Sequence, residues 1–194
     1  HSILPLANNG CVLFSIGSAR VDFTNTTGVI EAVTGSEVQL TSGASITGGT
    51  LSTAGTGLIR VLGNQNVFLS NLTIAGALVV DNNTFVHVFG TINNSGSFTL
   101  NAAGNNSDFR LGADTILTGA GTITLATNGN NRIDGDNVFR LTNVNNLIQG
   151  LGQIGVNGIA ITNQGTIDAN VAGQTLFLDP ANIANAFVNG PTGV

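Results

Sequence analysis

The side chains best suited to chemistry lie close together between Arg132 and Arg140. Asp134 and Asp136 stand two positions apart, Asn137 follows directly, and an arginine flanks the group at each end. Paired carboxylates suit general acid–base catalysis, as in glycosidases, and carboxylate and amide oxygens suit calcium. However, the segment lacks the distal glutamate of a calcium loop. We therefore expect the two arginines to neutralise the aspartates in a solvated turn, with an ion site and a catalytic pair as the alternatives.

The other reactive residues stand alone. His87 lies in the strand-like run Phe85–Phe89 without a second His or Cys nearby, so we expect a partly buried strand residue or one facing a neighbour. Cys11 is the single cysteine, and a buried inert thiol is favoured over an intermolecular disulfide. Gly119-Ala120-Gly121 lacks the lysine and the helix of a phosphate loop, which indicates a turn. The sequence thus predicts no catalytic, cofactor-binding or metal-binding residue, no cofactor and no enzymatic activity.

Two surface patterns have weaker implications. Thr122-Ile123-Thr124 is the kind of triplet that orders water on ice-binding surfaces, but the other repeats show Thr-Asn instead, which argues against that function. Glycosylation sequons matter only if the producing cell glycosylates. They begin at Asn25, Asn71, Asn82, Asn93 and Asn105.

A short repeat indicates which elements position these side chains. Each copy has an apolar residue, Thr or Asn, an Asn, a Gly and then further apolar residues two apart. Apolar residues two apart share one face of a strand, and Asn or Gly between them permits left-handed turns. Each unit is therefore a strand, a bend and another strand, and stacked units close a solenoid core. The copies span Ile92–Leu100, Ile161–Ala169, Phe23–Ala32 with one inserted residue, and a looser one opening at Leu141.

The repeats set the expected organisation of the chain. Coils of about twenty residues would give roughly nine or ten coils and a rod some 45 Å long, at about 4.8 Å per coil. The segment Phe187–Val194 resembles Phe23–Val29, so we interpret the chain as one large unit of about 165 residues plus the start of the next, near residue 187. Residues 1–194 are expected to form a single continuous domain.

Composition excludes several functional classes. Only 8% of the residues are charged, lysine is absent and the net charge is −5, which argues against nucleic acid and anionic membranes as partners. No apolar run reaches the roughly 18 residues of a membrane span, so no membrane insertion is expected. Abundant Ile, Val and Thr argue against disorder. Because ten Phe are the only aromatic residues, the core should be narrow.

A family resemblance rests on the stretch Leu141–Gly155 and its continuation Ile161–Asn170, with Gly90–Gly96 in the same style. These residues resemble the repeat region of large bacterial β-strand-repeat surface proteins, akin to autotransporter passengers and filamentous-haemagglutinin-like exoproteins. The resemblance implies secretion, a parallel β-helix and display at the cell surface. It implies no catalytic residue here.

Together these observations predict an all-β fold, a right-handed parallel β-helix, whose handedness rests on the resemblance and on strand twist. The expected function is that of a structural, non-catalytic extracellular segment of an adhesin, spacer or filament. Its expected partners are further coils, through end-to-end self-association or neighbouring repeats of a longer chain, with a cell-surface or glycan target as a further possibility. The alternative is a carbohydrate-binding or carbohydrate-cleaving β-helix, although such sites favour Tyr and Trp, which are absent.

Overall fold

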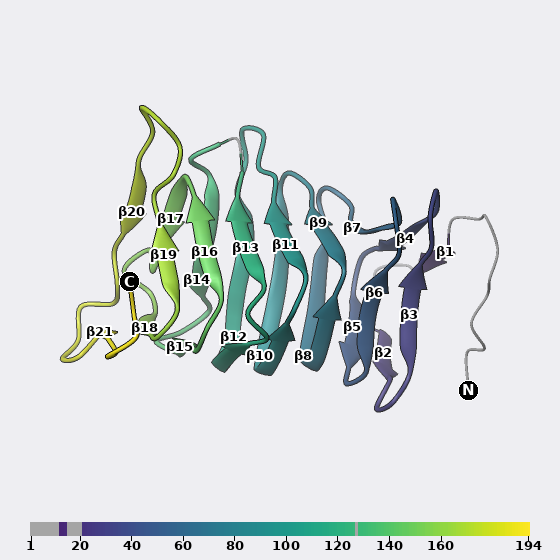
Figure 1. Cartoon of the computed structure of the whole chain (residues 1–194), viewed down its shortest axis with the longest axis horizontal. Coiled ribbons are helices and arrows are strands. Elements are labelled where there is room, and N and C mark those ends of the chain that lie inside the picture. Colours follow the sequence, from purple (N-terminus) through teal and green to yellow (C-terminus); the bar gives the residue numbers. More distant parts are fainter. Residues whose placement is uncertain (1–11, 15–20, 127) are drawn as a thin grey trace.

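The computed structural model shows a parallel β-solenoid of about seven turns, described over residues 12–14, 21–126 and 128–194. Every strand pairing in these ranges is parallel, and none of these residues is helical, so the predicted fold class is confirmed. The coils wind in a right-handed sense from the N-terminal to the C-terminal end (Figure 1). Within the described ranges, no helix is long and apolar enough to cross a membrane.

The solenoid has three lateral faces, and each full coil contributes one strand to each of them. Face 1 is an eight-stranded sheet, whereas faces 2 and 3 belong to one 13-stranded sheet. The strands of face 1 are β1 (Val12–Phe14), β4 (Glu37–Leu40), β7 (Leu58–Val61), β9 (Ala77–Val80), β11 (Ser97–Leu100), β13 (Thr122–Leu125), β16 (Leu147–Gly150) and β19 (Thr166–Asp168).

Three long strands run through both face 2 and face 3. They are β8 (Asn66–Ala75), β10 (Thr84–Asn94) and β12 (Ser107–Thr118). Face 2 also contains β2 (Val21–Thr24), β5 (Ala44–Thr47), β14 (Asn131–Gly135), β17 (Gly152–Ile154) and β20 (Leu176–Leu178). Face 3 also contains β3 (Val29–Ala32), β6 (Thr50–Thr53), β15 (Arg140–Asn143), β18 (Ala160–Asn163) and β21 (Phe187–Asn189).

The bend between faces 2 and 3 is built into the long strands. The register of β10 against its neighbours shifts next to Gly90, whose φ of +67° lies in the left-handed region that glycine adopts readily. The shift lets one continuous strand turn a corner while its backbone stays paired on both sides of the corner.

The core consists of rows of apolar side chains, one above another. On face 1, Val38, Ile59, Leu78, Phe98 and Ile123 are register partners in succession, and each is almost fully buried. The strands alternate between buried and partly exposed residues, because one face of each strand points inward. The inward-facing side chains of successive coils therefore form one continuous core.

The number of coils differs from the prediction of nine or ten. The structure has about seven turns, because the coils are longer and less uniform than twenty residues: Val12 pairs with Val38, 26 positions later, but Ile59 pairs with Leu78, only 19 later. At about 4.8 Å per coil, seven turns span roughly 34 Å rather than 45 Å.

The repeat copies also differ in their placement. The copies at 92–100, 141–147 and 161–169 all lie at the corner between face 3 and face 1, but the copy at 23–32 joins β2 on face 2 to β3 on face 3. Phe187 lies in β21 on face 3, whereas Phe23 lies in β2 on face 2. A restart of the large unit near residue 187 stays a prediction.

Candidate functional site

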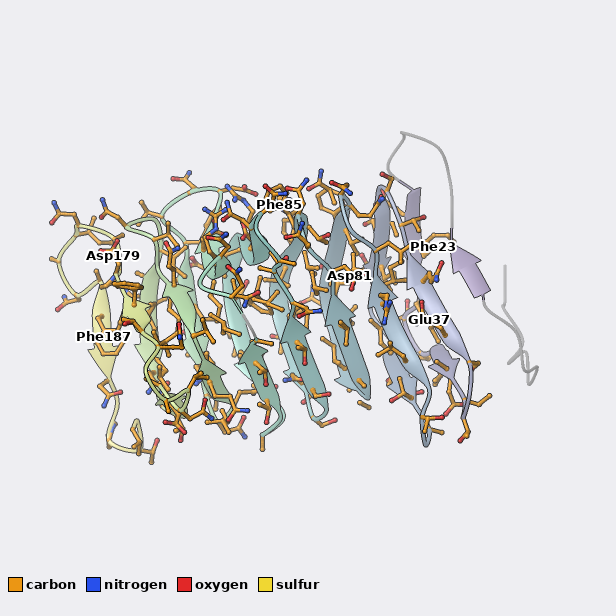
Figure 2. All side chains as sticks on the ribbon, turned by 90° about the horizontal axis from the view of Figure 1, so that it is seen from above. Phe23, Glu37, Asp81, Phe85, Asp179 and Phe187 are labelled. Atoms are coloured by element: carbon orange, nitrogen blue, oxygen red, sulfur yellow. The ribbon has the colours of Figure 1, made fainter. Side chains whose placement is uncertain are left out.

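Face 2 brings together the largest group of charged side chains among the described residues. Parallel register places His87 beside Arg110 and Arg110 beside Asp134, on β10, β12 and β14 in turn. Two positions earlier on the same strands, Asp108 of β12 lies beside Arg132 of β14 and forms a second row. Because alternate residues of a strand point to the same side, both rows project from the outer surface of face 2, which Phe85 marks in Figure 2. We call six residues the charge cluster: His87, Asp108, Arg110, Arg132, Asp134 and Asp136.

Asp108 is the most deeply buried member, with a fully buried side chain. Arg132 binds it with two parallel hydrogen bonds, Nε to Oδ1 at 2.9 Å and Nη2 to Oδ2 at 2.6 Å, and Arg110 Nη1 approaches Oδ2 at 3.5 Å. Burial raises the pKa of Asp108, against the lowering effect of the two arginines. Bidentate geometry of this kind is the strongest form of arginine–carboxylate pairing.

Arg110 is the centre of the cluster. Its Nη1 donates to Asp134 Oδ2 at 3.0 Å, its Nε donates to Asp136 Oδ1, and its guanidinium lies 5.6 Å from the ring centre of Phe85. Including Asp108, one arginine therefore contacts three carboxylates and one aromatic ring. Burial opposes ionisation of Arg110, but these carboxylates outweigh it, so its pKa is raised.

The buried negative charge of Asp134 has fewer hydrogen-bond donors around it than the charges of Asp108 and Asp136 have. Its side chain is only 8% exposed and its Oδ1 is buried without a hydrogen-bond partner, while Arg132 Nη2 stays 3.8 Å from Oδ2. Burial, assisted by the negative charge of Asp108, raises the pKa of Asp134 to about 6.

His87 and Asp136 close the cluster on its outer side. His87 Nδ1 lies 3.0 Å from Asp136 Oδ2, and the imidazole stacks on the ring of Phe68 at 4.9 Å. Burial lowers the pKa of His87, although Asp136 acts in the opposite direction. Partial burial opposes ionisation of Asp136, but the hydrogen bond from Arg110 and the contact with His87 outweigh it, so the pKa of Asp136 is lowered.

The prediction for the segment 132–140 is partly wrong. Asp134 lies in strand β14 and is buried, rather than in a solvated turn, and Arg132 binds mainly Asp108. Arg140 does not join the cluster: its guanidinium donates to Thr162 Oγ1 and to the carbonyl of Asn185, both at 3.0 Å. Residue spacing could not show that the solenoid places Arg110 between the two aspartates.

Other predicted features fall as follows. His87 is partly buried and faces a neighbour, as predicted, and Gly119-Ala120-Gly121 forms a turn. Cys11 lies outside the described residues. Asn137 is exposed, and its Oδ1 accepts from the amide of Val138. Of the described residues, no group of three or more His, Cys, Asp or Glu could hold a metal ion.

Three residues of this surface escaped the sequence interpretation: Asp108, Arg110 and Phe85. The available signal was the alternation in Ser107-Asp108-Phe109-Arg110-Leu111, where charged residues occupy every second position of a strand. That pattern places both charges on one outward face, but it does not identify their partners on other coils.

Two features of the charge cluster bear on catalysis and on sugar binding. Asp134 and Asp136 have pKa values shifted in opposite directions, as in a general acid and its partner base, but Arg110 occupies the space between them. Phe68 stacks with His87 at 4.9 Å and with Phe89 at 6.5 Å, so each of these rings contacts a neighbouring ring.

The cluster instead connects neighbouring coils to each other. Its contacts link β8, β10, β12 and β14, four strands that follow one another along the solenoid axis.

Comparison with protein-family models, curated proteins and solved structures finds no match to the chain.

Proposed function

We propose that the chain is a structural, non-catalytic β-solenoid segment of a secreted surface adhesin, spacer or filament, and that its coils continue end to end. The main support for this proposal is the set of open strand edges at the C-terminal end of the solenoid. Among the described residues, each strand of the last rung (β19, β20 and β21) pairs with another strand on one side only. Unpaired strand edges join other strands unless they are blocked.

The core is also incompletely covered at this end, which Phe187 and Asp179 mark in Figure 2. Leu178 is 44% exposed, although its register partner Ile154 on the preceding rung is fully buried. The amide of Val194 donates to the carbonyl of Gly165 and its carbonyl accepts from Ile167, at 3.0 and 2.9 Å. Val194 therefore already lies beside β19 in the parallel sense. A further coil would pair with the open edges of β20 and β21 and cover Leu178.

A second support is the internal use of polar groups. The members of the charge cluster bond mainly to residues of other coils, and two pairs of buried asparagines, Asn94 with Asn146 and Asn143 with Asn163, are hydrogen-bonded between coils. A spacer or a filament that bears force needs such contacts between neighbouring coils, because each coil contacts only its neighbours. Extracellular display rests on the resemblance.

The end-to-end proposal predicts concentration-dependent assembly. Leu178→Lys places a charge where a further coil would lie, whereas Phe177→Lys places one on the adjacent, outward side of the same strand. We expect sedimentation velocity and negative-stain microscopy to show end-to-end rods or filaments that lengthen with concentration. Leu178→Lys should abolish them, and Phe177→Lys should leave them.

Isolated rods of one length at every concentration would contradict stacking of separate chains. Continuation would then be restricted to neighbouring coils of one polypeptide. If Phe177→Lys disrupted assembly as strongly as Leu178→Lys, the contact would be lateral rather than end to end.

The alternative function, binding or cleavage of carbohydrate, is tested by a panel of neutral and anionic polysaccharides. We expect neither retention on the immobilised polymers nor release of reducing ends. Binding that is lost in Phe85→Ala but kept in a variant on face 1, such as Thr99→Ala, would instead assign a glycan site to face 2.

A further inference from the structure

The charge cluster contains more negative than positive groups. Asp108, Asp134 and Asp136 supply three carboxylates, whereas Arg110 and Arg132 supply two guanidiniums, so with His87 neutral the formal charge is −1. Most of these side chains are poorly solvated: Asp108 is fully buried, and Asp134 is 8% exposed. An unbalanced charge in such surroundings favours the uptake of one proton.

The contacts distinguish among the groups that could bind this proton. Both oxygens of Asp108 accept hydrogen bonds from Arg132, and both oxygens of Asp136 are bonded, one to Arg110 and one to His87. These bonds favour the ionised carboxylate. Asp134 differs, because only its Oδ2 is bonded and its Oδ1 is buried without a partner. Protonation therefore disrupts fewer hydrogen bonds at Asp134 than at Asp108 or Asp136.

We propose that the charge cluster is a proton-binding device in which Asp134 takes up one proton in mildly acid surroundings and thereby strengthens the stack of coils. The protonated carboxyl keeps its Oδ2 contact with Arg110 and removes the one uncompensated buried charge. This inference does not depend on the proposed structural function, since it concerns the stability of the solenoid alone.

The direction of the pH effect follows from the folded-state pKa of Asp134, about 6 against an ordinary value of 3.8. Between these two values the folded chain holds the proton that the unfolded chain has lost. The stabilisation is therefore complete below about pH 4 and is lost as the pH rises through about 6. Asp108, whose pKa is also raised, acts in the same direction.

Two neighbours act in the opposite direction. The lowered pKa of His87 means that the unfolded chain binds its proton more readily, so this contribution to stability is lost as the pH falls below 6.5. The lowered pKa of Asp136 has the same consequence below 3.8. Arg110 and Arg132 stay charged throughout. On the other side of Asp134, β17 places Gln153 next to Arg132 and contributes no titratable group.

The test uses two measurements on the full chain. The first is the carbon-13 shift of the Asp134 carboxyl in the wild-type protein between pH 3.5 and 8. The second is urea unfolding at pH 5.0 and 7.5 in His87→Gln, which lacks the opposing histidine, and in His87→Gln/Asp134→Asn. The matched control is the double variant His87→Gln/Asp168→Asn, which neutralises an aspartate at an exposed position of β19 instead of Asp134.

We expect the Asp134 carboxyl to titrate near pH 6. In His87→Gln, the equilibrium constant for unfolding should be about tenfold smaller at pH 5.0 than at pH 7.5 because of Asp134 alone. This difference should be lost with Asp134→Asn and kept with Asp168→Asn. An Asp134 carboxyl that stays ionised down to pH 4 would overturn the proposal, and so would a pH effect that Asp134→Asn leaves unchanged. The carboxyl titration decides the matter even if a variant fails to fold.

Discussion

Replacing Arg110 by alanine is expected to lower the free energy of unfolding by about 3 kcal/mol at pH 7.5, because the change removes the centre of the charge cluster. Asp134 would lose its one close cation, Asp136 would keep only His87, and Asp108 would keep only Arg132. Buried carboxylates without a partner are costly, and Phe85 would also lose its contact with the guanidinium. Urea unfolding followed by far-ultraviolet circular dichroism measures the change.

A second arginine provides the matched control. Arg60 also points outward from a strand, but its ion pair with Glu37 is 3.7 Å long and partly exposed. Such surface pairs contribute at most about 1 kcal/mol, so Arg60→Ala should have a much smaller effect. The cost of Arg110→Ala should also shrink at pH 4, where the carboxylates it leaves behind take up protons. Equal effects of the two substitutions would mean that the cluster adds no stability beyond ordinary surface pairing.

The sequence was sufficient to predict the class of fold, because that depends on local patterns. Runs such as Phe98-Thr99-Leu100 and Ile123-Thr124-Leu125 alternate with a period of two, and the turn residues between them exclude long helices. The number of turns depends on something else, the length of every corner loop. The coil from Ile59 to Leu78 spans 19 positions and the coil from Phe98 to Ile123 spans 25, yet both bury the same inward positions, so composition and repeat spacing do not distinguish them.

Because the corner loops vary in length, the candidate site could not be predicted from the sequence either. Asp108 and Arg132 are 24 positions apart, and His87 and Asp136 are 49 apart, yet each pair is in contact. Only the register of β10, β12 and β14 brings them together, and that register depends on the loops between them. Asp134 and Asp136 were visible as a pair because they lie on one strand end. Their partner Arg110 was not, because it belongs to the previous coil.

The repeated asparagine shows a related limit of local interpretation. In the sequence, Asn143 and Asn163 look like turn-forming residues after an apolar position. In the structure both are buried, and Asn143 Nδ2 donates to Asn163 Oδ1 at 2.9 Å, while Asn163 Nδ2 donates to Asn189 Oδ1 at 3.0 Å. Asparagines on three successive rungs thus form a hydrogen-bonded row at the corner between faces 3 and 1, in which Asn143 and Asn163 are buried and Asn189, on the last rung, is exposed. Their amide groups connect coils as well as permitting the bend.

Asn143→Ala should therefore destabilise the solenoid by about 3 kcal/mol, because several buried groups lose their partners at once. Asn143 Oδ1 accepts from the amide of Asn146 at 3.0 Å, and its Nδ2 donates to the carbonyl of Asn146 as well as to Asn163. After the substitution, the amide and the carbonyl of Asn146 and Oδ1 of Asn163 remain buried without these bonds. Thermal and urea unfolding measure the loss.

The matched control is Asn145→Ala in the same turn. Asn145 is exposed, and its Oδ1 accepts one hydrogen bond, from the amide of Ala120, which water can replace. Its substitution should cost about 1 kcal/mol or less. If Asn143→Ala were no worse than Asn145→Ala, the buried row would be a by-product of turn geometry. A large difference would mean that the asparagine of the repeat is retained for the contacts it makes between coils, which no single coil can provide for itself.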